Sequence, residues 1–311
     1  MIIYGNVLEQ DIKINSEVAV ALGKFDGLHR GHRTLIEQLS LAKSQRGLLC
    51  VVFAFVKSPK ETLEGEDMKY ILTTAEKRLF MEQNGVDILV ECPIKKEILS
   101  MEPEDFIEKI LKDKLNVKEI ICGSDFRFGH NRRGNVEFLR EHEHIYNYRT
   151  IIVDKLKYDE RDISSTYIRE EIANGNISLV NELLGYPYTV MGVVRHGKQL
   201  GRTIGFPTVN IVSEADKMLP PNGVYLTVAV IDGKEYPAIT NIGTRPTVDD
   251  SGNTTIETHL FDVSIDMYGR PLELRFLRFI RPEKKFENID KLKEAIRDDI
   301  RVCRDAIKDY F

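Results

Sequence analysis

Two histidines, three residues apart, stand in a glycine-rich segment that could bind phosphate. Residues 23–32 read GKFDGLHRGH and follow an apolar stretch directly, so we expect a turn between a strand and a helix. Glycines let the backbone approach a phosphate, and the free N–H groups of a helix N-terminus attract an anion. Lys24, His29 and His32 add positive charge there. The segment predicts a triphosphate site, and the alternative is a plain loop with surface histidines.

Two further segments are expected at the same edge of the fold. Residues 123–134 read GSDFRFGHNRRG after an apolar run, and residues 163–169 read ISSTYIR before a helical pattern. The second segment offers hydroxyls, a helix cap and a guanidinium that can grip phosphate oxygens. Each signal is weak alone, because serines before a helix are more often a cap. Phe126 and Phe128 are likewise more often core residues than a platform for a ring.

The back half holds a second glycine-rich segment, GVVRHGKQLGRTIGFPTVN at 192–210. Its glycines recur every four residues among cations: Gly197, Lys198, Gly201, Arg202 and Gly205. We assign this loop to nucleotide binding. Beyond it, Thr208 and Asn210 share one face of a predicted strand, and a hydroxyl with an amide oxygen suits Mg²⁺. For the glycine spacing alone, an ordinary hairpin is the alternative.

A carboxylate in residues 255–262, TIETHLFD, could act as a general base. In strand alternation Glu257 shares a face with Thr255 and His259. We expect Glu257 to point inward, near the glycines and the predicted magnesium site, where it could take a proton from an alcohol. A solvated strand glutamate is the more common case from the pattern alone.

These residues need two kinds of scaffold. The first half alternates apolar strands with helical patterns, which predicts a parallel sheet covered by helices. The expected strands are 17–25, 48–55, 87–92, 119–123 and 150–154, and the expected helices are 31–43, 74–84, 103–114, 134–142 and 165–173. After Gly185-Tyr186-Pro187 the period becomes alternating, which predicts an antiparallel barrel or sandwich. The spacing of apolar residues over 288–309 adds an amphipathic C-terminal helix. We therefore predict two domains, 1–185 and 186–311.

Composition excludes several classes of protein. The 311 residues are 42% hydrophobic and 30% charged, which supports a folded core and argues against disorder. The net charge is −5, so we expect no nucleic-acid partner. The longest apolar run, 48–56, is too short to span a membrane, and the N-terminus has no leader pattern. The four cysteines form no C-x-x-C pair, so we expect a reducing cytoplasmic location.

The three front segments, in this order and spacing, resemble the signatures of the FMN adenylyltransferase module of bacterial bifunctional riboflavin kinase/FAD synthetases. The resemblance implies a Rossmann-like nucleotidyltransferase domain that joins FMN and ATP to give FAD and pyrophosphate. It implies that His29, His32 and Arg169 act on the phosphates. The other nucleotide-binding residues would be Gly23, Lys24, Phe25, Asp26, Ser164, Ser165 and Thr166. The flavin would contact Asp125, Phe126, Phe128 and Asn131.

The back segments, together with NGVYLTVAV, NIGTRPT and YGRPLELRFLRFIRPEKKF, resemble the riboflavin kinase module. That resemblance implies a six-stranded antiparallel barrel with a C-terminal helix, which phosphorylates riboflavin with ATP and Mg²⁺. Glu257 would be the base, Thr208 and Asn210 would lie at the metal, and Arg281 near the flavin.

One departure keeps alternatives open. Where the family usually has Pro-His-Pro or Pro-Asn-Pro, this chain has Lys57-Ser58-Pro59, with a shorter side chain in the middle. We predict a cytoplasmic enzyme that makes FMN and FAD from ATP, riboflavin and FMN. One alternative is a riboflavin kinase with a weakened or lost adenylyltransferase, and another is a non-catalytic flavin-binding regulator. No membrane partner is expected, and a homo-oligomer is compatible with the sequence.

Overall fold

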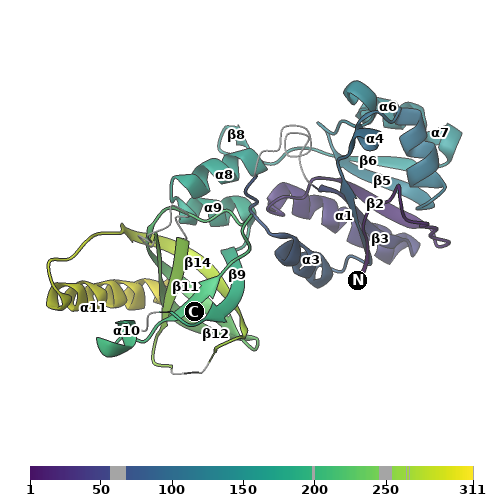
Figure 1. The fold of residues 1–311 in the computed structure, drawn as a ribbon. Coiled ribbons are helices and arrows are strands. Elements are labelled where there is room, and N and C mark those ends of the chain that lie inside the picture. Colours follow the sequence, from purple (N-terminus) through teal and green to yellow (C-terminus); the bar gives the residue numbers. More distant parts are fainter. Residues whose placement is uncertain (57–67, 198–199, 245–253, 264, 266, 311) are drawn as a thin grey trace. The chain divides into compact units, whose positions relative to one another are not determined.

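The computed structural model describes residues 1–56, 68–197, 200–244, 254–263, 265 and 267–310 (Figure 1). The chain divides into two compact units, Met1–Ser165 and Thr166–Phe311. Among the described residues, no helix is both long enough and apolar enough to cross a membrane.

The first unit is built on a six-stranded, wholly parallel sheet in the order β1-β4-β3-β2-β5-β6. Its strands are β1 (Ile2–Tyr4), β2 (Val18–Gly23), β3 (Leu49–Val56), β4 (Ile88–Pro93), β5 (Val117–Gly123) and β6 (Arg149–Val153). The inner strands are buried on both faces, which explains why they read as continuous apolar runs in the sequence. The predicted parallel sheet is confirmed.

Helices cover both faces of this sheet. Alternate residues of β2 enter different cores: Val18, Val20 and Leu22 face one, and Ala19 and Ala21 face the other. The alanine side is covered by α1 (Arg30–Arg46) and α3 (Thr74–Gln83). The remaining helices of the unit are α4 (Lys96–Leu99), α5 (Pro103–Asp105), η1 (Phe106–Lys112), η2 (His130–Arg132), α6 (Val136–Glu141) and α7 (Glu143–Tyr146). A small hairpin, β7 (Lys157–Tyr158) and β8 (Arg161–Asp162), follows.

The strand order reverses direction at β2. From β2 the chain proceeds to β3 and β4 on one side, and later returns to β5 on the other side of β2. Ligands of open parallel sheets bind beyond the carboxyl ends of strands at such a reversal. Two motifs of the sequence analysis follow these strands. The segment predicted to bind phosphate starts at Gly23 after β2, and the segment predicted to bind the flavin starts at Gly123 after β5.

Two details differ from the sequence prediction. The short edge strand β1 was not expected, because three residues are too few to show a period. The expected helix over 103–114 begins with one turn of α-helix and continues as a π-helix, η1. Pro103 stands in its first turn, where the missing N–H does no harm.

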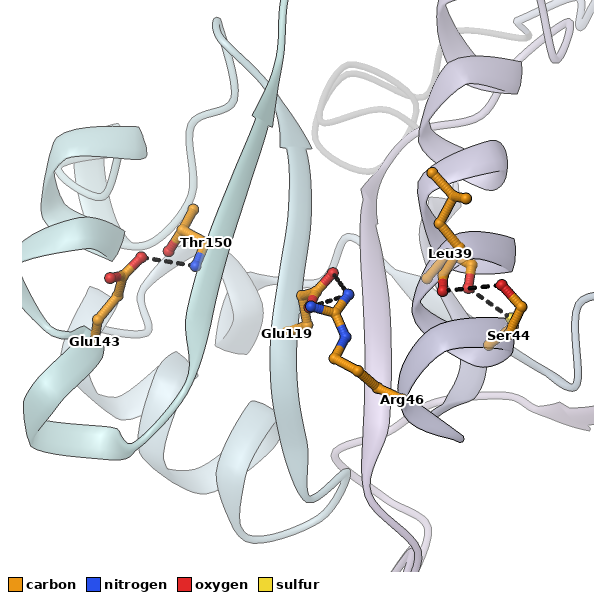
Figure 2. Close-up of polar contacts among 8 residues, drawn as sticks. Leu39, Ser44, Arg46, Glu119, Glu143 and Thr150 are labelled. Atoms are coloured by element: carbon orange, nitrogen blue, oxygen red, sulfur yellow. Dashed lines mark hydrogen bonds and ion pairs between the residues drawn. The ribbon is translucent and has the colours of Figure 1, made fainter.

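An ion pair with one buried partner joins α1 to strand β5 of the sheet (Figure 2). Arg46 Nη2 at the end of α1 lies 2.7 Å from Glu119 Oε1 on β5, and Glu119 is only 2% exposed. Figure 2 also shows how β6 is anchored, because the Thr150 backbone N–H donates to Glu143 Oε1 of α7 at 2.7 Å.

The second unit contains a closed antiparallel barrel in the order β10-β13-β12-β11-β14-β9, as predicted. The strands are β9 (Tyr188–Arg195), β10 (Val209–Val212), β11 (Gly223–Ile231), β12 (Lys234–Thr244), β13 (Thr254–Leu260) and β14 (Pro271–Pro282). Large rings fill the interior, among them Tyr188, Tyr225 and Phe276. A chain of hydroxyls runs beside them: Thr227 bonds Thr240 at 2.8 Å, and Thr240 bonds Thr258 at 2.9 Å.

Helices pack on this barrel from outside. The C-terminal helix α11 (Ile289–Ala306), which leads into η3 (Ile307–Asp309), covers an outer face through Cys303 and Ile307 against Val224 and Leu226. The short α10 (Leu200–Thr203) lies in the glycine-rich segment. Helix α8 (Ser165–Ala173) leads to α9 (Ile177–Leu184), where Asn181 accepts from the Tyr188 N–H and donates to the Phe276 carbonyl. Helix α9 thus belongs to the compact second unit, whereas the predicted boundary after residue 185 remains a prediction.

Candidate active sites

The turn after β2 is held in a constrained backbone shape by buried apolar side chains. Phe25 and Leu28 are fully buried, and both adopt positive φ angles, 52° and 43°, as does Gly27 at 83°. A Cβ on Gly27 would lie 3.0 Å from Ile71 Cδ1, so this crowded position with positive φ favours glycine. Residues held in such conformations cluster at ligand sites.

Asp26 fastens this turn to two other segments. Its carboxylate accepts from the backbone N–H of Ile71 at 3.1 Å, and its own carbonyl accepts from Ser165 Oγ at 2.8 Å. Asp26 is 5% exposed. The structure therefore shows Asp26 and Ser165 shaping the predicted nucleotide site by holding its backbone, and any contact with nucleotide stays a prediction.

The two histidines stack at the start of α1. Their ring centroids lie 3.8 Å apart, and His29 is the N-cap residue of the helix, although its side chain makes no capping bond. No acidic residue stands in the first turn, so the positive end of the helix dipole is left for a ligand. Gly31 permits this arrangement, because a Cβ there would lie 3.3 Å from the His29 ring.

Burial keeps both imidazoles neutral. It lowers the pKa of His29 to about 4 and lowers the pKa of His32 well below its usual value, to which the charges of His29 and Lys77 also contribute. The Nδ1 atoms of both rings are buried and, within the described part of the chain, have no hydrogen-bond partner. Two desolvated N–H-bearing rings beside an uncapped helix end suit a phosphate group.

The segment after β5 separates into core and surface residues. Phe128 is 5% exposed and packs against Phe106 and Phe126, at centroid distances of 5.4 and 5.6 Å. Phe128 thus lies in the core, which was the alternative considered from the sequence. Asp125 and Asn131 are exposed, and Asp125 pairs with Lys155 at 3.0 Å. Of this set, the exposed Asp125 and Asn131 and the partly buried Phe126 are accessible to a ligand.

The last predicted front-half residues lie at the start of α8. Ser164 is half-buried, and Thr166 is exposed. Arg169 lies on α8 and belongs to the second compact unit. Lys57–Pro59 and Lys198 lie outside the described residues, and the structure describes only the backbone of Arg202.

In the second unit, strand register brings the predicted magnesium and base residues together. Asn210 of β10 is the cross-strand partner of Glu257 of β13, and Asn241 of β12 is its partner on the other side. The hydroxyls of Thr240 and Thr258 fill the barrel interior, so their neighbours Asn241 and Glu257 face outward. The expectation that Glu257 points inward is therefore wrong, because that side of β13 is occupied by the threonine chain.

The glycine-rich loop closes on these residues. A Cβ on Gly197 would lie 2.4 Å from Asn210 Nδ2, and one on Gly201 would lie 2.3 Å from the Phe206 carbonyl and 3.3 Å from Thr208 Oγ1. Both positions thus require glycine, because other segments of the chain approach the backbone closely there. His259, the strand neighbour of Glu257, bonds the Pro207 carbonyl through Nδ1 at 2.8 Å and so fixes the segment that carries Thr208.

Arg281 is engaged with the C-terminal helix. Its Nε and Nη2 atoms donate to Asp299 of α11 at 2.9 and 2.7 Å. The expected role near the flavin therefore stays a prediction, and the observed role is to anchor α11 to β14. Over the described residues, no three His, Cys, Asp or Glu side chains gather into a metal cluster.

Comparison with known proteins gives a consistent result. The model of the FAD synthetase family matches residues 11–167, and that of the riboflavin kinase family matches residues 184–307. A bifunctional riboflavin kinase/FMN adenylyltransferase of Buchnera aphidicola is 36% identical over 304 residues, 96% of each chain. The protein of the same name from Bacillus subtilis is 34% identical over 90% of this chain and 89% of its own.

A solved structure from Streptococcus pneumoniae, titled a macrolide-efflux protein, has a TM-score of 0.89 and 32% identity. It covers 98% of this chain and 99% of its own. This chain is thus similar to that protein in both fold and sequence, although its printed name differs from the names of the two relatives above.

Proposed function

The chain belongs to the family of bifunctional riboflavin kinases/FMN adenylyltransferases, and on this premise we propose how its residues divide the work. The enzyme phosphorylates riboflavin with ATP to give FMN, and adenylylates FMN with ATP to give FAD and pyrophosphate. Because both family models match, the alternatives of a kinase alone or a non-catalytic regulator are not supported. In our proposal, residues 1–185 carry out adenylylation and residues 186–311 carry out phosphorylation.

For adenylylation we propose that the triphosphate of ATP binds at the N-terminus of α1. His29 and His32 donate hydrogen bonds to phosphate oxygens, and the backbone of Gly23–Asp26 lies along the nucleotide. An oxygen of the FMN phosphate attacks the α-phosphorus, the bond from that phosphorus to the bridging oxygen breaks, and pyrophosphate leaves with the electron pair. The attacking oxygen is already anionic, so the site needs only to position phosphates and stabilise charge. The neutral, desolvated state of the two imidazoles supports this assignment.

In the same proposal, the flavin binds to the segment after β5. Phe126, Asp125 and Asn131 are the members of the predicted set that a ligand can reach. Phe128 then contributes by packing behind Phe126, at a centroid distance of 5.6 Å. Ser164 contacts the triphosphate in this proposal, and the roles that the resemblance implies for Thr166 and Arg169 stay predictions.

For phosphorylation we propose that Glu257 removes the proton from the ribityl 5′-hydroxyl while its oxygen attacks the γ-phosphorus of ATP and ADP leaves. The observation that carries this assignment is the direct pairing of Asn210 with Glu257 across neighbouring strands. The side chains of such a pair lie about 5 Å apart, within reach of one reacting group.

The residues present fit a magnesium ion. Thr208 and Asn210 offer hard oxygen atoms beside the glycine-rich loop that would hold ATP. We propose that these two residues hold Mg²⁺ together with phosphate oxygens, and that the bound ion neutralises phosphate charge. The proposed partners are accordingly small molecules, namely ATP, riboflavin and FMN. The four buried free cysteines support a cytoplasmic location.

Chromatography of flavins tests the assignment of the base. Purified Glu257→Gln protein is incubated with riboflavin, ATP and Mg²⁺, and separately with FMN and ATP. Because general-base catalysis contributes roughly 10²–10⁴-fold, FMN formation should fall by that order, while FAD formation from supplied FMN continues. Glu273→Gln, which changes a half-buried glutamate of β14 that pairs with Arg275, is the matched control. Near-normal FMN formation by Glu257→Gln would remove Glu257 from the mechanism.

A further inference from the structure

A buried lysine stands on α3, the helix whose preceding residues are bonded to the nucleotide turn. Lys77 is in the first turn of α3, its N–H bonds the Thr73 carbonyl, and its side chain is only 6% exposed. Lysines are almost never fully buried, because removing an ammonium from water is costly. Lys77 lies far from the glycine-rich turn in the sequence, so the sequence did not indicate that it could belong to the phosphate site.

The start of α3 is attached to the nucleotide turn rather than merely packed near it. Asp26 accepts from the backbone N–H groups of Ile71 and Leu72, directly before the Thr73 cap of the helix. The Ile71 side chain also lies against Gly27. The start of α3, which carries Lys77 in its first turn, is therefore anchored to the turn that precedes the histidines.

The charge of Lys77 reaches His32. The pKa of His32 is lowered by burial, by His29 and by the positive charge of Lys77. A buried ammonium thus stands beside two imidazoles that would repel it if they were protonated. A buried cation beside two neutral rings that can donate hydrogen bonds suits an anionic ligand.

The neighbouring residues of α3 have structural roles. Glu76 accepts from the Thr73 N–H in the capping box at 2.9 Å. Arg78 Nε donates to the buried carboxylate of Glu91 on β4 at 3.0 Å. The next cation along the helix is thus directed to the sheet, whereas Lys77 is the one whose charge acts on His32.

We propose that the Lys77 ammonium binds the triphosphate of ATP beside His29 and His32, as a third phosphate ligand in adenylylation. This inference rests on the proposed site at the N-terminus of α1. When the bond between the α-phosphorus and the bridging oxygen breaks, negative charge grows on the departing pyrophosphate. A fixed cation in a site of low dielectric stabilises that charge more than a solvated one can. Lys77 thus contributes mainly to the rate of adenylyl transfer.

Steady-state kinetics of the full chain test this role. In Lys77→Met, which keeps the length and apolar stem, kcat for FAD formation should fall by about 10²-fold or more. The KM for ATP should change much less, and inhibition by inorganic pyrophosphate should weaken. Riboflavin phosphorylation is the internal control. Lys109→Met is the matched control variant, because it removes the same charge from an exposed pair with Asp105.

Each result decides the question. FAD formation by Lys77→Met equal to that of Lys109→Met would overturn the proposal, as would a loss that appears together with lost hydrogen-exchange protection in β2 and α1. If wild-type rates persist in His32→Ala, the proposed site itself fails, which is a separate outcome. A second measurement does not depend on the folding of a variant. In wild-type protein labelled with nitrogen-15 lysine, the Nζ resonance of Lys77 should shift when inorganic pyrophosphate is added, and an unmoved resonance would refute the contact.

Discussion

Replacement of Arg46 by methionine should destabilise the first unit far more than the loss of an ordinary surface charge. Arg46 is the partner of Glu119, a carboxylate of β5 that is 2% exposed between β2 and β6. Removing one member of a buried ion pair leaves the other charge desolvated, which typically costs about 3–5 kcal/mol. The Arg46 side chain is itself 36% exposed, so water offsets part of the loss. We therefore expect about 3 kcal/mol, the lower end of that range.

This free energy corresponds to a measurable change. For a unit of this size, 1 kcal/mol shifts the unfolding temperature by about 2–4 °C, so Arg46→Met should lower it by about 6–12 °C. Because the chain has two compact units, a single melting curve mixes two transitions. Hydrogen exchange of the β5 amides in increasing urea isolates the transition of the first unit.

Two further variants make the reasoning refutable. Lys109→Met breaks the exposed pair with Asp105 and should cost less than about 1 kcal/mol. The double variant Arg46→Met/Glu119→Met removes both charges and should recover most of the stability lost by Arg46→Met alone. If Arg46→Met costs no more than Lys109→Met, water or another group compensates Glu119, and the assignment of a buried ion pair is wrong.

Two other predictions concern the stacked histidines. His29→Ala or His32→Ala should each lower FAD formation by roughly 10²-fold, as expected for the loss of a donor to a phosphoryl group, while riboflavin phosphorylation is retained; equal loss of both activities would contradict a dedicated phosphate site. The folded-state pKa of His29 is about 4, below the ordinary 6.5, so the unfolded chain binds more protons as the pH falls. His29 alone should decrease the stability of the first unit by about 3 kcal/mol from pH 6.5 to pH 4, and His29→Asn should weaken the pH dependence; denaturant titrations across that range decide it.

Sequence alone predicted those parts of the fold whose signals are local. Strands β2 to β5 are buried on both faces and therefore appear as apolar runs. The barrel strands show the alternation of a sheet with two different faces. The glycine-rich turns were visible for the same reason, since the need for close backbone approach at Gly197 or Gly201 lies in one short segment.

The remaining features depend on contacts between distant segments. The motif predicts that Asp26 binds nucleotide. In the structure its carboxylate accepts a hydrogen bond from the Ile71 backbone N–H, and the spacing of residues gives no sign of this contact. Asn241 became a neighbour of Glu257 only through strand register. In the sequence, Lys77 has the pattern of a solvent-exposed charge on an amphipathic helix, and only the structure shows that it is buried.

The direction in which Glu257 points was mispredicted for a related reason. Alternation separates the two faces of β13 but does not tell which of them is the interior of a closed barrel. The inward direction was expected because a general base would lie near the glycines and the predicted magnesium site. The structure instead gives the interior to Thr258 and its hydroxyl partners.

The threonine chain has a consequence for how the second unit finds its active geometry. A strand that slips by one residue exchanges its two faces, so Glu257 would enter the barrel and Thr258 would leave it. Thr227, Thr240 and Thr258 hydrogen-bond only when β11, β12 and β13 are aligned as observed. In any slipped pairing these hydroxyls would lose their partners, and a carboxylate would be desolvated among aromatic rings. The three hydroxyls therefore disfavour misfolded barrels in which the strand that carries Glu257 has its two faces exchanged.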